Sequence, residues 1–353
     1  MSSGRARIGI VGLGRMGAVH AANLAGACPS AALVACFDAD AGLAAGAGER
    51  YGVEVAPDLE ALLGDGRLDG VVIATPTPTH AGVALAAAAA GVPAFCEKPI
   101  SLERAATVAV VEAFEAAGVL LQVGFNRRFD ATVADTARRV RAGELGAPYL
   151  LRISQRDQSP PPMGFLASSG GIFVDMGIHD FDLARFLVGD VVRVHALGTA
   201  LSDPGFAALG DADTALVTLE FANGALGVVD LSRVAGYGYE SSAELMGAKA
   251  TVRLEMPPAF LAEWRRHNEA VRPLLSSYDR RYAPAFVAEL EAFAQAVRDG
   301  APSPVSGREA LAAFDVALAA SAAHALGHAV SPQEAAALAP RSPAPPDSPE
   351  GGS

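Results

Sequence analysis

An acid, a base and a proline stand side by side in the stretch "FCEKPIS", where Glu97, Lys98 and Pro99 follow a short apolar run. If that run is a strand of a parallel sheet, its carboxyl end faces the crevice in which such sheets bind ligands. The ammonium of Lys98 could then stabilise an alkoxide as a hydroxyl group loses its proton. Pro99 would fix the chain direction, and Lys-Pro bonds can be cis. The alternative is an ordinary solvated lysine near a helix start.

A second group of reactive side chains lies in "GGIFVDMGIHDFDLARF". Asp175 and His179 are four residues apart and therefore share one face of a helix, with Asp182 three residues further on. The apolar residues around them indicate a largely buried helix, so the Asp and His need partners. His179 could be a general base, with Asp175 orienting it or the substrate and raising its proton affinity. The alternatives are an Asp–His pair satisfied within a core, and a metal site with Asp182. Because no Cys/His cluster completes a ligand set, we expect no metal.

A glycine-rich loop near the start of the chain has the spacing of a dinucleotide site. "RIGIV" runs into "GLGRMG", which places Gly12, Gly14 and Gly17 in the pattern G-x-G-x-x-G. Between a strand and a helix, these glycines permit a tight turn and let a pyrophosphate approach backbone N–H groups. The alternative is a glycine-rich turn of any α/β protein. We expect the loop residues Gly12, Gly14, Arg15, Met16 and Gly17 to contact the cofactor.

The acid that follows favours NAD. Asp38 ends the second strand, 21 residues beyond Gly17, where a carboxylate can bind ribose hydroxyls and repels a 2′-phosphate. An alternative role for Asp38 is a helix N-cap. "ATPTPTH", at the end of the fourth strand, is placed to line the reactive half of the cofactor, although His80 could instead be a surface residue. The further expected cofactor contacts are Asp38, Thr75, Pro76, Thr77, His80, Glu97 and Lys98.

The elements that position these residues fall into two groups. From residue 7 to residue 123, apolar runs such as "ALVACF" and "GVVIAT" alternate with Ala-rich helical stretches, which indicates a doubly wound parallel sheet of the Rossmann type in residues 1–125. Residues 126–330 then combine helices near 130–141, 284–298 and 307–327 with consecutive strand patterns such as "TALVTLEF". This predicts an α+β domain with a large, open, mainly antiparallel sheet. Residues 331–353, rich in Pro, Ser and Gly, are predicted to be disordered.

Composition excludes several classes of protein. The 353 residues exceed what one core usually fills, so two domains are expected. The net charge of −12 disfavours nucleic acid and anionic membrane surfaces as partners. Three cysteines without C-x-x-C spacing, the absence of a signal-peptide pattern and the interrupted Ala-rich runs favour a cytoplasmic protein.

These motifs, in this order, resemble the Gfo/Idh/MocA oxidoreductases over about residues 5–330. The resemblance rests on the glycine loop, Glu97-Lys98-Pro99, "GFNRRFD" and "GGIFVDMGIHD". It implies a Rossmann domain and a second domain whose open sheet often mediates dimers or tetramers. It also implies catalytic roles for Lys98, Asp175 and His179. The segments that approach the substrate in such enzymes contain Arg127, Arg128 and Tyr237 here.

Within the family, "RDQSPPP" ahead of the Asp/His helix is similar to bacterial inositol 2-dehydrogenases. The resemblance therefore implies NAD-dependent oxidation of a cyclic polyol hydroxyl to a ketone, with myo-inositol to 2-keto-myo-inositol as the leading case. Phe286 stands where relatives often carry tyrosine, and Gln155 where some have histidine. The alternatives are a scyllo-inositol or sugar dehydrogenase, and a non-catalytic, dinucleotide-responsive regulator. The catalytic trio is intact, which favours the enzyme.

Overall fold

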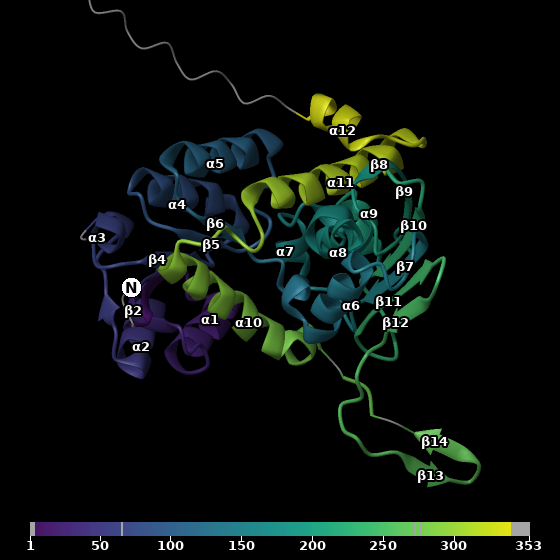
Figure 1. Cartoon of the computed structure of the whole chain (residues 1–353), viewed down its shortest axis with the longest axis horizontal. Helices are drawn as coiled ribbons and strands as arrows, with labels where there is room; N and C mark the ends of the chain where they lie inside the picture. The colour runs from purple at the N-terminus through teal and green to yellow at the C-terminus, as the bar shows by residue number, and fades with distance from the viewer. Residues whose placement is uncertain (1–3, 65, 272, 276, 340–353) are drawn as a thin grey trace, which may run out of the picture.

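The chain folds around two sheets, one parallel and one mixed (Figure 1). The computed structural model describes residues 4–339 apart from residues 65, 272 and 276. The predicted fold class, a Rossmann-type parallel sheet plus a second, mainly antiparallel sheet, is confirmed.

The parallel sheet has the strand order β3-β2-β1-β4-β5-β6. Every residue of its central strand β4 is buried, because helices cover both faces of the sheet and leave no side for polar residues. The strand order reverses between β1 and β4, so the loops after these two strands open the crevice for a ligand. The strands are β1 (Ala6–Val11), β2 (Ala31–Phe37), β3 (Glu54–Val55), β4 (Gly70–Ile73), β5 (Ala94–Cys96) and β6 (Leu121–Val123).

Helices cover the parallel sheet on two sides (Figure 1). One side carries α1 (Arg15–Gly26), α2 (Ala41–Tyr51) and α10 (Tyr278–Asp299), and the other α3 (Leu59–Gly64), α4 (Thr77–Ala89) and α5 (Arg104–Ala117). Helix α10 returns from the far end of the chain and buries Leu290 and Phe293 against the sheet. It begins six residues before Pro284, where we predicted its start. The helix thus extends past the proline toward its N-terminus, and Tyr282, in these additional turns, is buried.

The mixed sheet has the strand order β12-β11-β7-β10-β9-β8, and only its β7/β10 pair is parallel. Buried and exposed residues alternate along β9, as expected when one face is covered and the other is open. Helices α6 (Ala131–Arg141), α8 (Ile178–Val188) and α11 (Gly307–Leu326) lie on the covered face. The strands are β7 (Pro148–Arg156), β8 (Val191–Thr199), β9 (Thr214–Phe221), β10 (Leu226–Ser232), β11 (Glu240–Gly247) and β12 (Thr251–Leu254).

Shorter elements complete the fold. A hairpin of β13 (Trp264–Arg266) and β14 (Glu269–Val271) projects from the body of the molecule (Figure 1). The others are the 3₁₀ turn η1 (Asn126–Phe129), α7 (Met163–Leu166), the π-helical turn η2 (Ile172–Met176), α9 (Pro204–Ala208) and α12 (Pro332–Leu338).

The end of the chain departs from the prediction. Residues 332–338, placed in the predicted disordered tail, form helix α12, so the prediction was wrong there. Ser331 and Glu334 build a capping box, and Ala335 is buried, which together stabilise this short helix despite the Pro-rich sequence beyond it. Residues 340–353 lie outside the described part of the chain. Among the described helices, α11 alone is long and apolar enough to cross a membrane, but half of it is buried in the protein core.

Candidate active site

The glycine loop closes tightly between β1 and α1. Gly12 has a φ of +88°, and a Cβ there would lie 2.5 Å from the backbone nitrogen of Thr75. A Cβ on Gly17 would collide with the carbonyl oxygen of Gly12. Gly14 is the N-cap of α1, so the free N–H groups of the first helical turn, beginning at Arg15, face outward from the loop. This cradle suits a pyrophosphate.

Asp38 lies directly beside this cradle. Its Oδ2 accepts a hydrogen bond from the backbone N–H of Leu13 at 2.6 Å, and its Oδ1 accepts one from Asp40 at 2.8 Å. The carboxylate therefore joins the glycine loop to the loop after β2. It is not the N-cap of α2, because Asp40 accepts the capping bonds from Gly42 and Leu43.

The loop after β4 forms the opposite wall of the crevice. Thr75 comes two residues after the end of β4. Pro76 is the N-cap of α4, and Thr77 is the first residue of that helix. The hydroxyl of Thr75 is buried and has no hydrogen-bond partner among the described residues, as expected of a group that awaits a ligand.

His80 takes a structural position in that wall. It is buried, so the surface alternative is wrong. Its Nδ1 lies 2.9 Å from the carbonyl oxygen of Pro99, and its Nε2 lies 2.7 Å from that of Thr75. Both ring nitrogens are thus occupied by backbone groups, which ties the loop after β4 to the loop after β5.

Glu97 turns into the protein rather than toward the crevice. It is buried, its Oε1 lies 2.6 Å from Nε2 of His20, and its Oε2 accepts the backbone N–H of Lys98 at 3.2 Å. The carboxylate is thus engaged by α1, and the expected contact of Glu97 with the cofactor stays a prediction. The following peptide bond, Lys98–Pro99, is cis.

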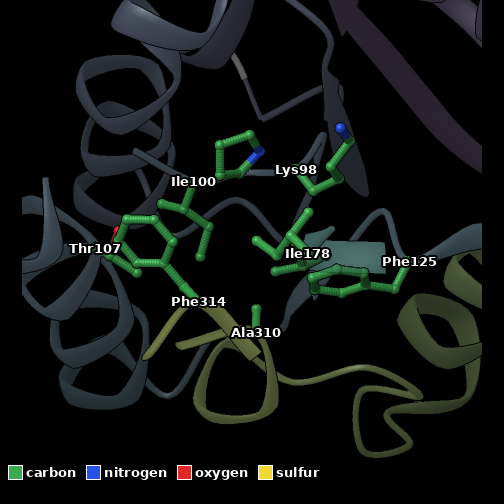
Figure 2. A pocket seen from close by; sticks show the side chains of 9 residues that line it. Lys98, Ile100, Thr107, Phe125, Ile178, Ala310 and Phe314 are labelled. Atoms are coloured by element: carbon green, nitrogen blue, oxygen red, sulfur yellow. The ribbon is translucent and has the colours of Figure 1, made fainter. Parts of the chain in front are cut away.

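Lys98 reaches the second domain. Its Nζ donates to the backbone carbonyl oxygen of Asp175 at 2.9 Å and lies 3.7 Å from Oδ1 of the same residue. The stem of Lys98 covers a small apolar cavity of about 10 Å³, which Ile178 and Phe125 also line. Figure 2 shows its ammonium pointing away from this cavity. The apolar contacts hold the stem while the charged end stays free to meet a ligand.

Asp175 is anchored by a residue that the sequence analysis missed. Its Oδ2 accepts a hydrogen bond from the guanidinium of Arg233 at 2.7 Å, and Arg233 is 1% exposed. The remaining Arg233 nitrogens, Nε and Nη2, are buried and have no partner among the described residues. Asp175 makes no described hydrogen bond to His179, so the alternative of a self-satisfied Asp–His pair is wrong. The reason is local: Asp175 belongs to the π-helical turn η2, whereas His179 lies in the first turn of α8.

His179 is a base without a fixed partner. Its Nδ1 is buried and unpaired among the described residues, and its ring meets Phe125 edge-on with 6.0 Å between the ring centres. Burial, followed by the positive charges of Lys98 and Arg127, holds the pKa of His179 well below its ordinary value of 6.5. The imidazole is therefore neutral and able to accept a proton.

The two arginines of "GFNRRFD" serve different partners. Arg127 is buried, forms an ion pair with Asp180 and donates to Oε1 of Gln155 at 2.8 Å. Gln155 in turn donates to the hydroxyl of Tyr239 at 3.1 Å. Because Asp180 directly follows His179 in the chain, this buried network lies beside the reactive residues.

All three guanidinium nitrogens of Arg128 bind carboxylates, and its predicted approach to the substrate stays a prediction. Arg128 is buried and pairs with Asp182 and Glu309, each at 2.6 Å. This ion pair draws Asp182 away from Asp175 and His179, and the metal alternative loses one of its three ligands. Tyr237 is half exposed, and its hydroxyl contacts Arg156 and Glu240. The structure gives it no contact with the other candidate residues.

Asp157 is a second site residue that the sequence analysis did not single out. It directly follows β7 and its N–H donates to Ser232, so it lies beside Arg233, which directly follows the parallel neighbour β10. Burial, with a contribution from Asp175, raises the pKa of Asp157 to about 6 despite the opposing charge of Arg233. Two charged residues at the carboxyl ends of adjacent parallel strands were the available signal.

The chain matches two models of one family. Residues 6–125 match the model described as an oxidoreductase family with an NAD-binding Rossmann fold, and residues 133–253 match the GFO/IDH/MocA C-terminal domain.

Individual relatives cover nearly the whole chain. The chain is 39% identical to a myo-inositol 2-dehydrogenase of Thermotoga maritima over 86% of its own length and 91% of the relative. It is 36% identical to an NAD(+)-dependent scyllo-inositol 2-dehydrogenase of Bacillus subtilis over 89% and 92% of the two chains. A crystal structure of scyllo-inositol dehydrogenase from Lactobacillus casei with bound NAD(H) and scyllo-inositol superposes with a TM-score of 0.86, at 28% identity, over 93% of this chain and 99% of that one.

Proposed function

The chain belongs to the GFO/IDH/MocA family of NAD-dependent oxidoreductases, and on that premise we propose that it oxidises one hydroxyl group of a cyclic polyol to a ketone. The leading substrate is myo-inositol, with 2-keto-myo-inositol as product. One observation carries the proposal: the ammonium of Lys98 meets Asp175 2.9 Å away, beside the neutral base His179.

His179, Lys98 and Asp175 have different roles in the proposed reaction. His179 accepts the hydroxyl proton, since its depressed pKa keeps it neutral. Lys98 binds the same oxygen and stabilises the negative charge that develops on it. Asp175, held by Arg233, fixes the position of the ammonium. In this assignment Asp175 orients Lys98 rather than His179.

The crevice fits NAD. The glycine loop and the first turn of α1, including Arg15 and Met16, would hold the pyrophosphate, and Asp38 would bind the adenosine ribose. Thr75, Pro76 and Thr77 would line the nicotinamide half, where the unpaired hydroxyl of Thr75 offers a hydrogen bond. NAD, when bound, accepts the hydride that leaves the substrate carbon. The chain's own residues bind, orient and take up the proton.

The choice between polyols depends on the wall of the pocket. The relatives act on myo-inositol or scyllo-inositol, according to their names. Gln155, which stands where some relatives have histidine, is buried, and both ends of its amide are engaged, by Arg127 and by Tyr239. The alternative substrates are therefore scyllo-inositol and related sugars.

The test is formation of NADH by the purified protein with NAD or NADP. The panel contains myo-, scyllo- and chiro-inositol, glucose, galactose and xylose. We expect turnover with NAD and myo-inositol. Turnover with scyllo-inositol alone would move the assignment to that isomer. Saturable NADH binding without turnover on any substrate would favour a dinucleotide-responsive regulator.

We also propose a homo-oligomer, a dimer or tetramer, formed through the open face of the mixed sheet. Leu197 and Leu216, which are paired on the adjacent strands β8 and β9 of this face, are each more than half exposed. Neighbouring apolar residues on an open sheet favour self-association. Light scattering of the wild type and of Leu216→Glu tests this, because a charge on the face should shift the mass toward the monomer.

A further inference from the structure

A buried cluster of His20, Glu97 and Glu289 joins three elements behind the reactive lysine. His20 comes from α1, Glu97 from the end of β5, and Glu289 from α10. One oxygen or nitrogen atom from each residue lies within 4.8 Å of the others, and all three side chains are buried. None of the roles assigned above uses Glu289.

Glu289 has no hydrogen-bond partner among the described residues. It is 0% exposed, and neither of its carboxyl oxygens accepts a hydrogen bond from a donor among those residues, while the carboxylate of Glu97 lies within 4.8 Å. An ionised carboxylate in that position would lack both water and a counter-charge, which is prohibitively costly. Two buried carboxylates this close cannot both ionise, so one must hold a proton.

The proton belongs on Glu289. Glu97 has His20 and the backbone N–H of Lys98 as donors, and these, with the charge of Lys98 and a contribution from His80, favour its ionised form. Burial and the negative charge of Glu97 raise the pKa of Glu289 well above its ordinary value. The β6 residue Gln122 adds no charge and contacts only the backbone carbonyl of Glu289.

We propose that Glu289 is a protonated acid that donates its proton in a hydrogen bond to Glu97 and thereby positions Lys98. Glu97 then accepts from three elements: His20, the Lys98 backbone and Glu289. Through this hydrogen bond, helix α10 fixes the position of the loop after β5, which carries the reactive lysine, relative to helix α1. Glu289 is a positioning residue, and its link to catalysis rests on the role of Lys98 proposed above.

The protonation is tested by infrared spectroscopy of the enzyme without substrate. The difference spectrum of wild type minus Glu289→Gln at neutral pH should contain the carbonyl band of a protonated carboxylic acid. The matched control is Glu291→Gln on the same helix, where hydrogen bonds to Ser30 and Gln295 hold the pKa of Glu291 low and no such band should be lost. If Glu289→Gln loses no such band relative to the wild type, the proposal is overturned. A stoichiometric transition metal in the purified protein with both carboxylates ionised would also overturn it.

The positioning role is tested by kinetics. Glu289→Leu, which cannot donate, should lower kcat by roughly 10- to 100-fold, the scale of a small misplacement of a reactive group, with little change in the Kd of NAD. Glu289→Gln, which keeps a donor, should recover most of that loss. Equal kcat in wild type and Glu289→Leu would overturn the positioning role. If the Leu variant does not fold, Glu289→Met, which also lacks a donor, takes its place, and equal kcat in wild type and in Glu289→Met would overturn the role. The infrared result is independent of which substrate the enzyme uses.

Discussion

The ammonium of Lys98 donates to the backbone carbonyl of Asp175 at 2.9 Å, and this contact joins the parallel sheet to the π-helical turn η2, which precedes the helix that carries His179. Lys98 lies two residues after the end of β5, whereas Asp175 lies 77 residues later and is fixed by Arg233. The reactive lysine is thus held between the two halves of the molecule. Its charge acts on His179 and contributes to the lowered pKa of that imidazole.

Replacement of Lys98 by Met should abolish most of the turnover. The apolar stem still covers the same cavity, but the charge that stabilises the substrate oxygen is gone, so we expect kcat to fall by at least about 100-fold. The Kd of NAD, measured by fluorescence, should change little. The chain has one other lysine, and Lys249→Met is the matched control because Lys249 is exposed and contacts only the backbone of Gly143. Full activity in Lys98→Met would remove Lys98 from the mechanism.

The rate should persist in mildly acidic solution. Because the pKa of His179 lies well below 6.5, its imidazole stays neutral there, and the acid limb of kcat/KM attributable to it should lie below pH 6.5. The substitution His179→Gln should remove that limb along with most of the activity. A limb above pH 6.5 that disappears in this variant would contradict the assignment.

The same residue predicts a trend in stability. In the unfolded chain His179 binds a proton as the pH falls through about 6.5, whereas in the folded protein it does not. The unfolded state then holds more protons than the folded state. The free energy of unfolding should therefore decrease as the pH is lowered through this range. Urea titrations should show a smaller fall for His179→Gln than for the wild type.

The local motifs were predictable from the sequence because neighbouring residues determine them. Gly17 is required by a close contact with the carbonyl oxygen of Gly12 within one turn, and Asp38 follows from the length of one strand-helix-strand unit. The close contact that requires Gly12 comes instead from Thr75, after a later strand. The position of Lys98 at the crevice followed from the rule that parallel strands bind ligands at their carboxyl ends, and Asp175 was singled out by its helical spacing from His179.

The partners of the charged residues could not be predicted, because they depend on tertiary packing. Arg233 comes 58 residues after Asp175, and nothing local to either residue indicates the pair. Likewise, Asp182 has the helical spacing to join His179, but its side chain contacts Arg128 from η1. The π-helical turn at residues 172–176 changes the faces that a regular helix would have predicted for Asp175.

Cofactor preference should depend on Asp38. Replacing it by Ser removes the charge that repels a 2′-phosphate, so the ratio of kcat/KM for NAD over NADP should fall on the order of tenfold. The KM for NAD should rise as well, because the carboxylate also holds the glycine loop through Leu13. Asp40→Asn is the control, since Asp40 caps α2 and should leave the ratio unchanged. An unchanged ratio in Asp38→Ser would show that other residues exclude NADP.

Asp182 should matter for stability rather than for turnover. Its carboxylate pairs with Arg128 in the core, so Asp182→Asn leaves a buried guanidinium with Glu309 as its remaining charged partner. Breaking a buried ion pair in this way costs about 3 kcal/mol of unfolding free energy, which urea titration measures. Asp135→Asn, which breaks an exposed pair with Arg138 on α6, should leave the unfolding free energy nearly unchanged. At a temperature where the Asp182 variant is folded, we expect its KM for the polyol to match that of the wild type, because Glu309 still holds the guanidinium of Arg128. A raised KM without loss of stability would indicate that Arg128 contacts the substrate.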